Sequence, residues 1–318
     1  MIKSYGHIGE MELESGAVAP VQDIVYTDRQ GKEIRISILR EDLLDAELGG
    51  NKFRKLRYHL LKARQEEQTT LLSFGGPWSN HLYSLAAAGE RFGFSTIGVV
   101  RGEEPPGSTE TIKDLRKKGM QLLFVSRSEF ADNATDYYRA WLHDRLGSFY
   151  LIPEGGGGTL GVSGTMEICG EHTRKYGRIF CAAGTGTTAA GMLLSLVPGQ
   201  RLCVVPAMKG GAYLREGITS LLRNYLFDFS EGGMDDFPFD LYDNFHFGGF
   251  ARVNPELLSF MSDFQGQTGV ALDHVYTGKL LFGVCALLSE NPSWQQEGIL
   301  VLHSGGLQGL RGLKEYGG

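Results

Sequence analysis

Hydrophobic positions recur with two different spacings along most of the chain. In residues 51–64, Phe53, Leu56, Leu60 and Ala63 recur at helical spacing with lysines and arginines opposite, which predicts an amphipathic helix. Elsewhere, short runs rich in β-branched and aromatic residues alternate with helix-like windows. The predicted extended runs are EIRISILRED, TLLSFGG, STIGVVRG, QLLFVS, FYLIPEGG, GRIFCAAG, QRLCVVPAM and GILVLHSGG, and the further predicted helices are 79–93, 109–119 and a stretch near 134–146. Repeated βα units predict an α/β fold with parallel sheets flanked by helices.

Glycines gather where these predicted strands end. The chain has 45 glycines, and the clusters are Gly49 with Gly50, Gly75 with Gly76, residues 155–158, Gly184 with Gly186, and Gly305 with Gly306. In open parallel sheets, ligands bind at the carboxyl ends of the strands. The five clusters therefore predict one cleft that is lined by backbone.

The segment 228–253 departs from the alternation of strands and helices. It is irregular, acidic and aromatic. We therefore expect a long loop over a functional face of the molecule.

Composition bounds the class of protein. The 318 residues allow one or two domains, and a net charge of −6 with 21% charged residues gives no sign of nucleic-acid or membrane-surface binding. The longest apolar run, residues 280–288, is far shorter than a membrane-spanning helix, and no secretory signal begins the chain. We expect a cytoplasmic protein with a small-molecule partner. Four scattered cysteines, without metal-ligand spacing, predict buried small hydrophobes and no metal site.

The strongest candidate for a phosphate site is GTGTTAAG at residues 184–191, which follows one predicted strand and opens a helix. Its glycines allow backbone N–H groups to converge on an anion, the helix N-terminus adds positive partial charge, and the threonine hydroxyls donate further hydrogen bonds. The alternative is a tight turn that packs on small residues. For the second glycine run, 155–158, we favour a structural loop.

Lys52 lies at the start of the first predicted helix, where the helix dipole disfavours a cation. A lysine that forms a Schiff base must lose its proton readily, and the nearby cations Arg54, Lys55 and Arg57 would lower its pKa. The alternative is a solvated basic face.

Polar residues also follow a predicted strand at Ser79, Asn80 and His81. Ser79 or Asn80 is suited to cap the next helix. Both could instead face a ligand, with Asn80 bonding an oxygen of an aromatic ring and Ser79 contacting substrate. For His81 a structural role is the alternative, and for Tyr276 the alternative is packing in the core.

Five motifs in this order resemble the 1-aminocyclopropane-1-carboxylate (ACC) deaminase and D-cysteine desulfhydrase family of pyridoxal-phosphate (PLP) enzymes. They are GGNKFRKL at 49–56, GGPWSNH at 75–81, GTGTTAAG at 184–191, VYTGK at 275–279 and HSGG at 303–306. The resemblance implies a tryptophan-synthase-β-like fold with two lobes and the cofactor in the cleft between them. It implies a large PLP-binding domain of residues 1–55 and 166–318, a small α/β domain of residues 56–165, and a homodimer.

The resemblance also implies roles for single residues. Lys52 holds PLP as a Schiff base and moves the proton, Asn80 bonds the phenolic oxygen, and Thr277 approaches the pyridine nitrogen. The phosphate is held by Thr185, Gly186, Thr187 and Thr188 with Lys55. Ser79 and Tyr276 are the further catalytic candidates, and the candidate substrate-binding residues are Ser79, Asn80, His81, Tyr276 and Ser304.

Departures from the family pattern favour one branch. ACC deaminases usually have glutamate and leucine where this chain has Thr277 and Ser304, and a tyrosine about where Phe250 stands. A glutamate keeps the pyridine nitrogen protonated, whereas a threonine supports a weaker electron sink that suffices for an easily leaving thiol. We therefore expect α,β-elimination on a small D-amino acid such as D-cysteine, with ACC deamination as the alternative and a non-catalytic phosphometabolite-binding module as a remote one. Trp78 is expected to narrow or reshape the pocket.

Overall fold

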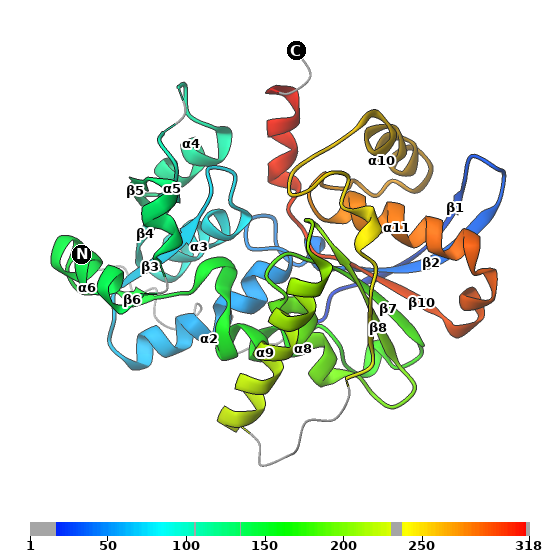
Figure 1. Ribbon diagram of the computed structural model, residues 1–318, viewed down its shortest axis with the longest axis horizontal. Coiled ribbons are helices and arrows are strands. Elements are labelled where there is room, and N and C mark those ends of the chain that lie inside the picture. Colours follow the sequence, from blue (N-terminus) through cyan, green and yellow to red (C-terminus); the bar gives the residue numbers. More distant parts are fainter. Residues whose placement is uncertain (1–16, 105, 134, 230–236, 316–318) are drawn as a thin grey trace.

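A smaller, four-stranded sheet occupies one side of the molecule (Figure 1). The computed structural model describes residues 17–104, 106–133, 135–229 and 237–315. The strand order is β5-β4-β3-β6, and every pairing is parallel. The strands are β3 (Thr70–Gly75), β4 (Ser95–Arg101), β5 (Gln121–Val125) and β6 (Tyr150–Leu151), and the helices among them are α3 (Asn80–Phe92), α4 (Glu110–Lys117), α5 (Arg127–Ala131) and α6 (Asp136–Leu146). These elements confirm the predicted alternation over this half of the chain.

A larger, six-stranded sheet has the order β1-β2-β10-β7-β8-β9. Its strands are β1 (Val21–Thr27), β2 (Glu33–Arg40), β7 (Arg178–Ala183), β8 (Arg201–Pro206), β9 (Phe239–Leu241) and β10 (Ile299–His303). Only β1 is antiparallel, pairing with β2 at the edge. We did not predict β1. It is an edge strand with mostly exposed residues, so its apolar signal is weak.

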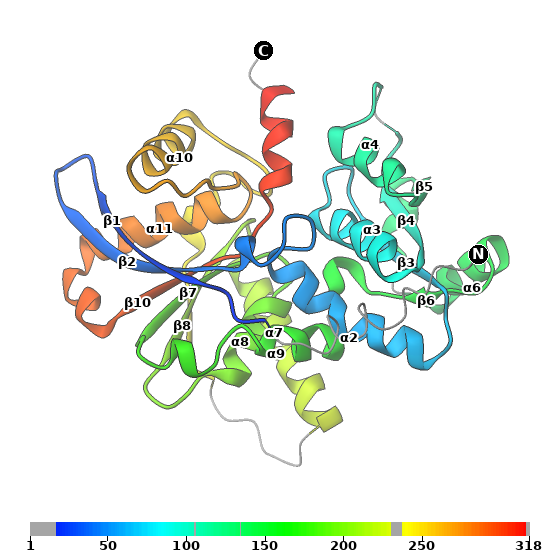
Figure 2. The same ribbon diagram turned by 180° about the vertical axis from the view of Figure 1, so that it is seen from behind.

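Helices cover both faces of this sheet, as Figure 1 and the reverse view in Figure 2 show. Successive strand residues alternate between the faces: Phe180 belongs to the core beneath one helical layer, and its neighbours Ile179 and Cys181 belong to the core beneath the other. The first layer is α10 (Pro255–Thr268) and α11 (Thr277–Glu290), and the second is α7 (Gly158–Met166), α8 (Thr187–Ser195) and α9 (Gly211–Phe229). The parallel α/β fold is therefore confirmed.

The helix α2 (Asn51–Gln65) connects the two sheets, and the predicted domain boundary at residues 55 and 56 falls inside it. The four-stranded sheet lies within residues 56–165, while the domain limits themselves stay a prediction. After β10, the chain forms a 3-10 helix, η6 (Leu307–Glu315), drawn in red between the two sheets in both views.

The structure also bears on the predicted Gly49–Gly50 turn, the predicted loop 228–253 and the cysteines. Gly49 and Gly50 do not end a strand, because β2 stops at Arg40 and a short 3-10 helix, η1 (Glu41–Leu43), intervenes. The predicted loop 228–253 is wrong in part, because its first two residues end a helix that runs to Phe229, and it contains β9 and the 3-10 helix η4 (Asp243–Phe245). Its residues 230–236 lie outside the described part of the chain. The four cysteines are free and buried, as predicted. Among the described residues, no helix is long and apolar enough to span a membrane.

Candidate active site

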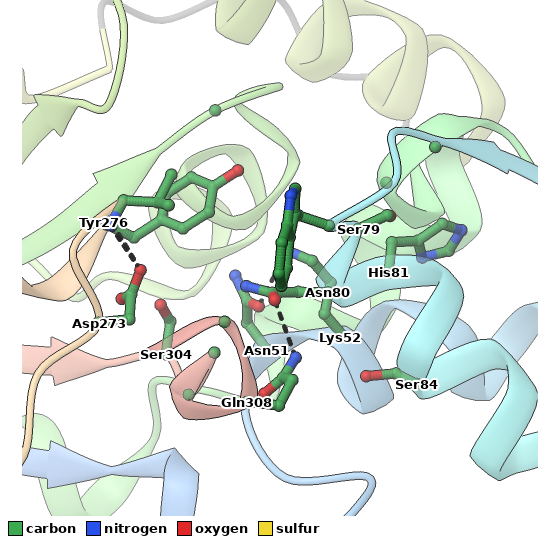
Figure 3. Close-up of a pocket in the computed structure, with 18 of the residues that line it drawn as sticks. Asn51, Lys52, Ser79, Asn80, His81, Ser84, Asp273, Tyr276, Ser304 and Gln308 are labelled. Carbon is green, nitrogen blue, oxygen red and sulfur yellow. Dashed lines mark hydrogen bonds between the residues drawn. The ribbon is translucent and has the colours of Figure 1, made fainter. Parts of the chain in front are cut away.

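A cavity of about 780 Å³ lies where the two sheets face each other, and four of the five predicted glycine clusters reach its wall together with Gly49 of the fifth. Strand ends of both sheets contribute, with Gly75 at the end of β3, Gly76 after it, and Gly184 after β7. Figure 3 shows side chains from α2, α3 and the segments around 273–276 and 304–308 pointing into it. The predicted cleft at the carboxyl ends of the strands is therefore confirmed.

Lys52 lies in the first turn of α2, on the wall of the cavity. Its Nζ donates to Asn51 Oδ1 at 3.3 Å and lies 5.8 Å from the centroid of the Tyr276 ring. Burial lowers the pKa of Lys52 to about 8, against the carboxylate of Asp273, which raises it. An amine with this pKa exchanges its proton near neutral pH.

The neighbouring arginines are not the cause of this shift, which corrects our sequence reasoning. Arg54 pairs with the buried carboxylate of Glu41 at 2.9 Å, and Arg57 pairs with Glu167 at 2.5 Å. Their charges are therefore compensated locally. Loss of solvent around Lys52 is the dominant effect.

Asn51 ties the Lys52 turn to two other parts of the site. Its Nδ2 donates to Thr188 Oγ1 at 2.8 Å, and its backbone N–H donates to the carbonyl of Ser304 at 3.3 Å. Gly50 has a φ of +86°, and a Cβ there would collide with the same Ser304 carbonyl. The GGN and SGG motifs thus interlock through their backbones. Sequence reasoning missed Asn51, although it lies inside the GGNK motif.

The N-terminus of α8 opens onto the cavity beside this turn. Gly186 precedes the helix with a φ of +85°, and Thr185, Gly186 and Thr188 line the cavity. Thr187 is buried behind them, with its Oγ1 3.3 Å from Thr185 Oγ1. Because the first amides of a helix have no intrahelical acceptor, those of residues 187–189 can bind an anion.

Lys55 places its side-chain amine at the cavity wall. It is only 4% exposed, and burial together with the nearby Lys52 lowers its pKa well below the usual range. Within the described chain, its amine has neither a hydrogen bond nor an ion pair.

The glycine run 155–158 packs closely against Lys55, since a Cβ at Gly156 would lie 2.9 Å from Lys55 Cβ. This close packing fits the structural role that we favoured for the run 155–158, but Gly155 also lines the cavity.

His81 is neutral and has one nitrogen without a partner. Its Nε2 lies 2.8 Å from Ser73 Oγ, which itself donates to the carbonyl of Ile152, so Nε2 carries the proton. Burial holds the pKa of His81 well below the usual range, and its Nδ1 has no hydrogen-bond partner in the described structure. The Lys55 amine and the open end of α8 together fit a bound phosphorylated group, because both can donate to its oxygens.

Ser79 and Asn80 start α3 at the opposite wall. Ser79 caps the helix, accepting from the Leu82 N–H at 3.1 Å, which confirms the predicted capping. Asn80 Oδ1 accepts from Gln308 Nε2 at 2.8 Å, so its Nδ2 is the group left for the cavity. The amides of Asn80 and His81, in the first turn, have no intrahelical acceptor.

Tyr276 and Thr277 are held by one buried carboxylate, that of Asp273. Asp273 Oδ2 accepts from the N–H groups of Val275 and Tyr276, and Oδ1 accepts from the N–H and the hydroxyl of Thr277 at 2.8 and 2.7 Å. Burial raises the pKa of Tyr276, which stays a phenol at neutral pH. Thr277 is fully buried and does not line the cavity, so the structure does not bring its hydroxyl to the ligand space. Asp273, which we did not predict, does line it.

The remaining motif residues divide into cavity and supporting residues. Ser304 lines the cavity, whereas His303 is buried between Asp42 Oδ1 at 3.1 Å and the carbonyl of Ala271 at 2.8 Å. Lys279 is also buried, and its Nζ donates to the carbonyls of Ala207, His246 and Gly249.

Lys279 thereby holds the loop that brings Phe250 to the cavity, edge-on to Tyr276 at 6.1 Å between ring centroids. Trp78 lines the cavity and packs against Gly312, where a Cβ would lie 3.0 Å from its ring.

Comparisons with known proteins agree with this geometry. The chain is 28% identical over 299 residues to a bifunctional D-cysteine desulfhydrase/ACC deaminase of Arabidopsis thaliana, covering 86% of this chain and 72% of that protein. It is 27% identical over 314 residues to a D-cysteine desulfhydrase of Salmonella choleraesuis, covering 93% of both. A crystal structure of an ACC deaminase homologue superposes with a TM-score of 0.79 at 25% identity, covering 94% of this chain and 93% of that one.

The family model described as pyridoxal-phosphate dependent enzyme matches residues 22–305. This match includes every cavity element described above except η6. Because the match spans most of the chain and the cavity residues fit a phosphorylated cofactor, the chain belongs to the family of pyridoxal-phosphate dependent enzymes.

Proposed function

We propose that the protein is a PLP-dependent lyase that eliminates the β-substituent of a small D-amino acid, with D-cysteine as the substrate that fits best. The convergence of Lys52, Tyr276, Asn80 and the N-terminus of α8 on one cavity carries this proposal. Relatives named for D-cysteine desulfhydration support the substrate. Membership of an enzyme family removes the non-catalytic binding module from consideration.

The cavity offers a partner for each polar part of PLP. Lys52 would attach the cofactor covalently, and Asn80 Nδ2 would donate to the phenolic oxygen. The phosphate would lie on the amides of α8, with the hydroxyls of Thr185 and Thr188 and the ammonium of Lys55 around it. When bound, PLP supplies an electron sink that stabilises the negative charge left at the substrate Cα.

The chain's own groups account for substrate binding. A substrate carboxylate would accept hydrogen bonds from the backbone N–H groups of Asn80 and His81. These groups lie at the N-terminus of α3, where the helix dipole is positive. Ser79, His81 and Ser304 also line the cavity. These contacts would hold the Cα–H bond toward Lys52.

Proton transfer would use Lys52 and Tyr276. With its pKa lowered to about 8, the Lys52 amine can take the Cα proton near neutral pH. The Tyr276 phenol keeps its proton, since burial raises its pKa, and it can donate to the departing sulfur. Overall, D-cysteine and water give pyruvate, ammonia and hydrogen sulfide.

The environment of Thr277 favours the elimination of a thiol, which leaves easily, over the opening of the ACC ring. Thr277 has no carboxylate, and its hydroxyl is bonded to Asp273 and does not line the cavity, so this position lacks the glutamate expected in ACC deaminases. A weaker electron sink suffices for a thiol. A homodimer and a cytoplasmic location, expected from the sequence, stay predictions.

The test incubates purified protein with D-cysteine and measures sulfide and pyruvate. We expect both products in equal amounts, and no product from Lys52→Ala. Lys62→Ala is the matched control, because Lys62 lies on the same helix with its side chain 47% exposed, and it should retain full activity. Release of 2-oxobutanoate from ACC, with no sulfide from D-cysteine, would favour the alternative reaction. Turnover by Lys52→Ala would contradict the proposal.

A further inference from the structure

Gln308 forms a hydrogen bond to the side-chain amide of Asn80 at the cavity. It lies in η6, and its Nε2 donates to Asn80 Oδ1 at 2.8 Å, as the dashed line in Figure 3 shows. An asparagine amide has an acceptor oxygen on one side and a donor NH2 on the other. Because the oxygen is used by Gln308, Asn80 presents a donor to the cavity.

The same segment also limits where this amide can lie. Gly306 has a φ of +92°, and a Cβ there would come within 2.8 Å of Asn80 Nδ2. A Cβ at Gly309 would lie 3.8 Å from Asn80 Oδ1. The amide is therefore enclosed by the backbone of residues 306–309, and Gln308 is its hydrogen-bonding partner from that segment.

Two contacts anchor η6 beside α3 and α4. The Arg311 guanidinium donates to the carboxylate of Asp114 in α4, and the Trp78 ring packs against Gly312. Gln308 precedes these contacts along η6 and itself lines the cavity. Figure 3 shows the Gln308 side chain reaching the Asn80 amide from this segment, with the hydrogen bond drawn as a dashed line.

We infer that Gln308 is a positioning residue that fixes the Asn80 amide with its NH2 toward the anionic ring oxygen of the cofactor. The inference rests on the proposed function, in which Asn80 binds that oxygen. The reversed amide would set its carbonyl oxygen against the anionic oxygen and replace an attraction by a repulsion. Hydrogen bonding to the ring oxygen stabilises its ionised form, so Gln308 acts on the cofactor through Asn80.

The test compares Gln308→Ala and Gln308→Glu in the full chain. A glutamate can only accept, so Asn80 would turn its NH2 toward residue 308 and its oxygen toward the cofactor. The Kd for PLP is measured by titrating cofactor-free protein and following tryptophan fluorescence, and the absorption spectrum of bound PLP is recorded against pH. We expect Kd to rise about tenfold for Gln308→Ala and more, up to roughly a hundredfold, for Gln308→Glu. The pH at which the absorption spectrum of bound PLP is half changed should also shift, and it should shift further for Gln308→Glu than for Gln308→Ala.

Gln295→Glu is the matched control. Gln295 lies in another 3-10 helix, η5 (Pro292–Glu297), where it accepts from the exposed Arg35 N–H, and its substitution adds the same charge away from the cavity. It should change neither Kd nor spectrum. In an Asn80→Ala background, Gln308→Glu should change Kd less than twofold, because the residue through which it acts is gone.

Different results identify which idea fails. If wild-type protein takes up no PLP, the proposed function is overturned and the inference with it. If wild-type protein takes up PLP but Gln308→Glu has a wild-type Kd and spectrum, the inference alone is overturned. An undiminished effect of Gln308→Glu in the Asn80→Ala background would also overturn it, since Gln308 would then act independently of Asn80.

Discussion

Lys52 should react with the aldehyde of PLP at neutral pH far faster than an ordinary lysine does. Its pKa is about 8 instead of 10.5. At pH 7 about one Lys52 amine in eleven is then unprotonated, against about one in three thousand for an ordinary lysine, a difference of roughly 300-fold. Because only the unprotonated amine is nucleophilic, the rate of attachment should rise about tenfold per pH unit below 8 and level off above 8.

The rate is measured by mixing cofactor-free protein with PLP between pH 6 and 10 and following the absorption band of the covalent linkage. A small lysine peptide, mixed with PLP in the same buffers, corrects for the ionisation of PLP itself. Lys52→Arg should show no linkage band, which assigns the signal to this residue.

A rate that keeps rising through pH 10 would refute the reasoning. Lys52 would then have an ordinary pKa, as it would on the solvated basic face that the sequence left open. A plateau near pH 8 that persists in Lys52→Arg would assign the reaction to another buried lysine, such as Lys55 or Lys279, and would contradict the role of Lys52.

Three further substitutions test the scaffold of the site by urea unfolding. Gly50→Ala should cost at least about 2 kcal/mol and weaken PLP binding, because the residue has a positive φ and its Cβ would strike the Ser304 carbonyl; an unchanged midpoint would contradict the interlocked loops. Lys279→Met should cost about 2 to 4 kcal/mol by leaving three carbonyls unpaired, and wild-type stability would show that they find other donors. Glu41→Ala should cost about 3 kcal/mol, since it leaves the buried Arg54 with only the longer contact to Glu167 at 3.4 Å; a loss below about 1 kcal/mol would mean that Glu167 compensates the charge.

Local patterns in the sequence were sufficient to predict most of the helices and strands. The helix of α2, the strands β3 and β7 and the cap at Ser79 were all predicted from residues that interact within a few positions. These elements can be recognised in the sequence because periodicity and capping depend on residues that are close together along the chain. The edge strand β1 was missed, since most of its residues are exposed and its pairing with β2 leaves no signal in the local pattern.

The candidate site could be predicted only in part. The family motifs correctly indicated Lys52 and Tyr276 as residues of one cavity. The glycine turn after β7 indicated the start of α8, because ligands bind at the carboxyl ends of parallel strands. The cause of the lowered Lys52 pKa could not be found, since burial depends on chain segments remote in sequence. The roles of these residues in catalysis stay predictions.

What the sequence determined by itself is the class of the molecule: an α/β chain, glycine turns at strand ends, and five motifs in the order of a PLP enzyme. Only the tertiary structure decided which polar groups in the site form hydrogen bonds with each other. Thr277 faces Asp273 and not the cavity, and Asn80 is oriented by Gln308, 228 residues away. The physical reason is that secondary structure follows local periodicity, whereas hydrogen-bond partners and burial are fixed by contacts between segments that only folding brings together.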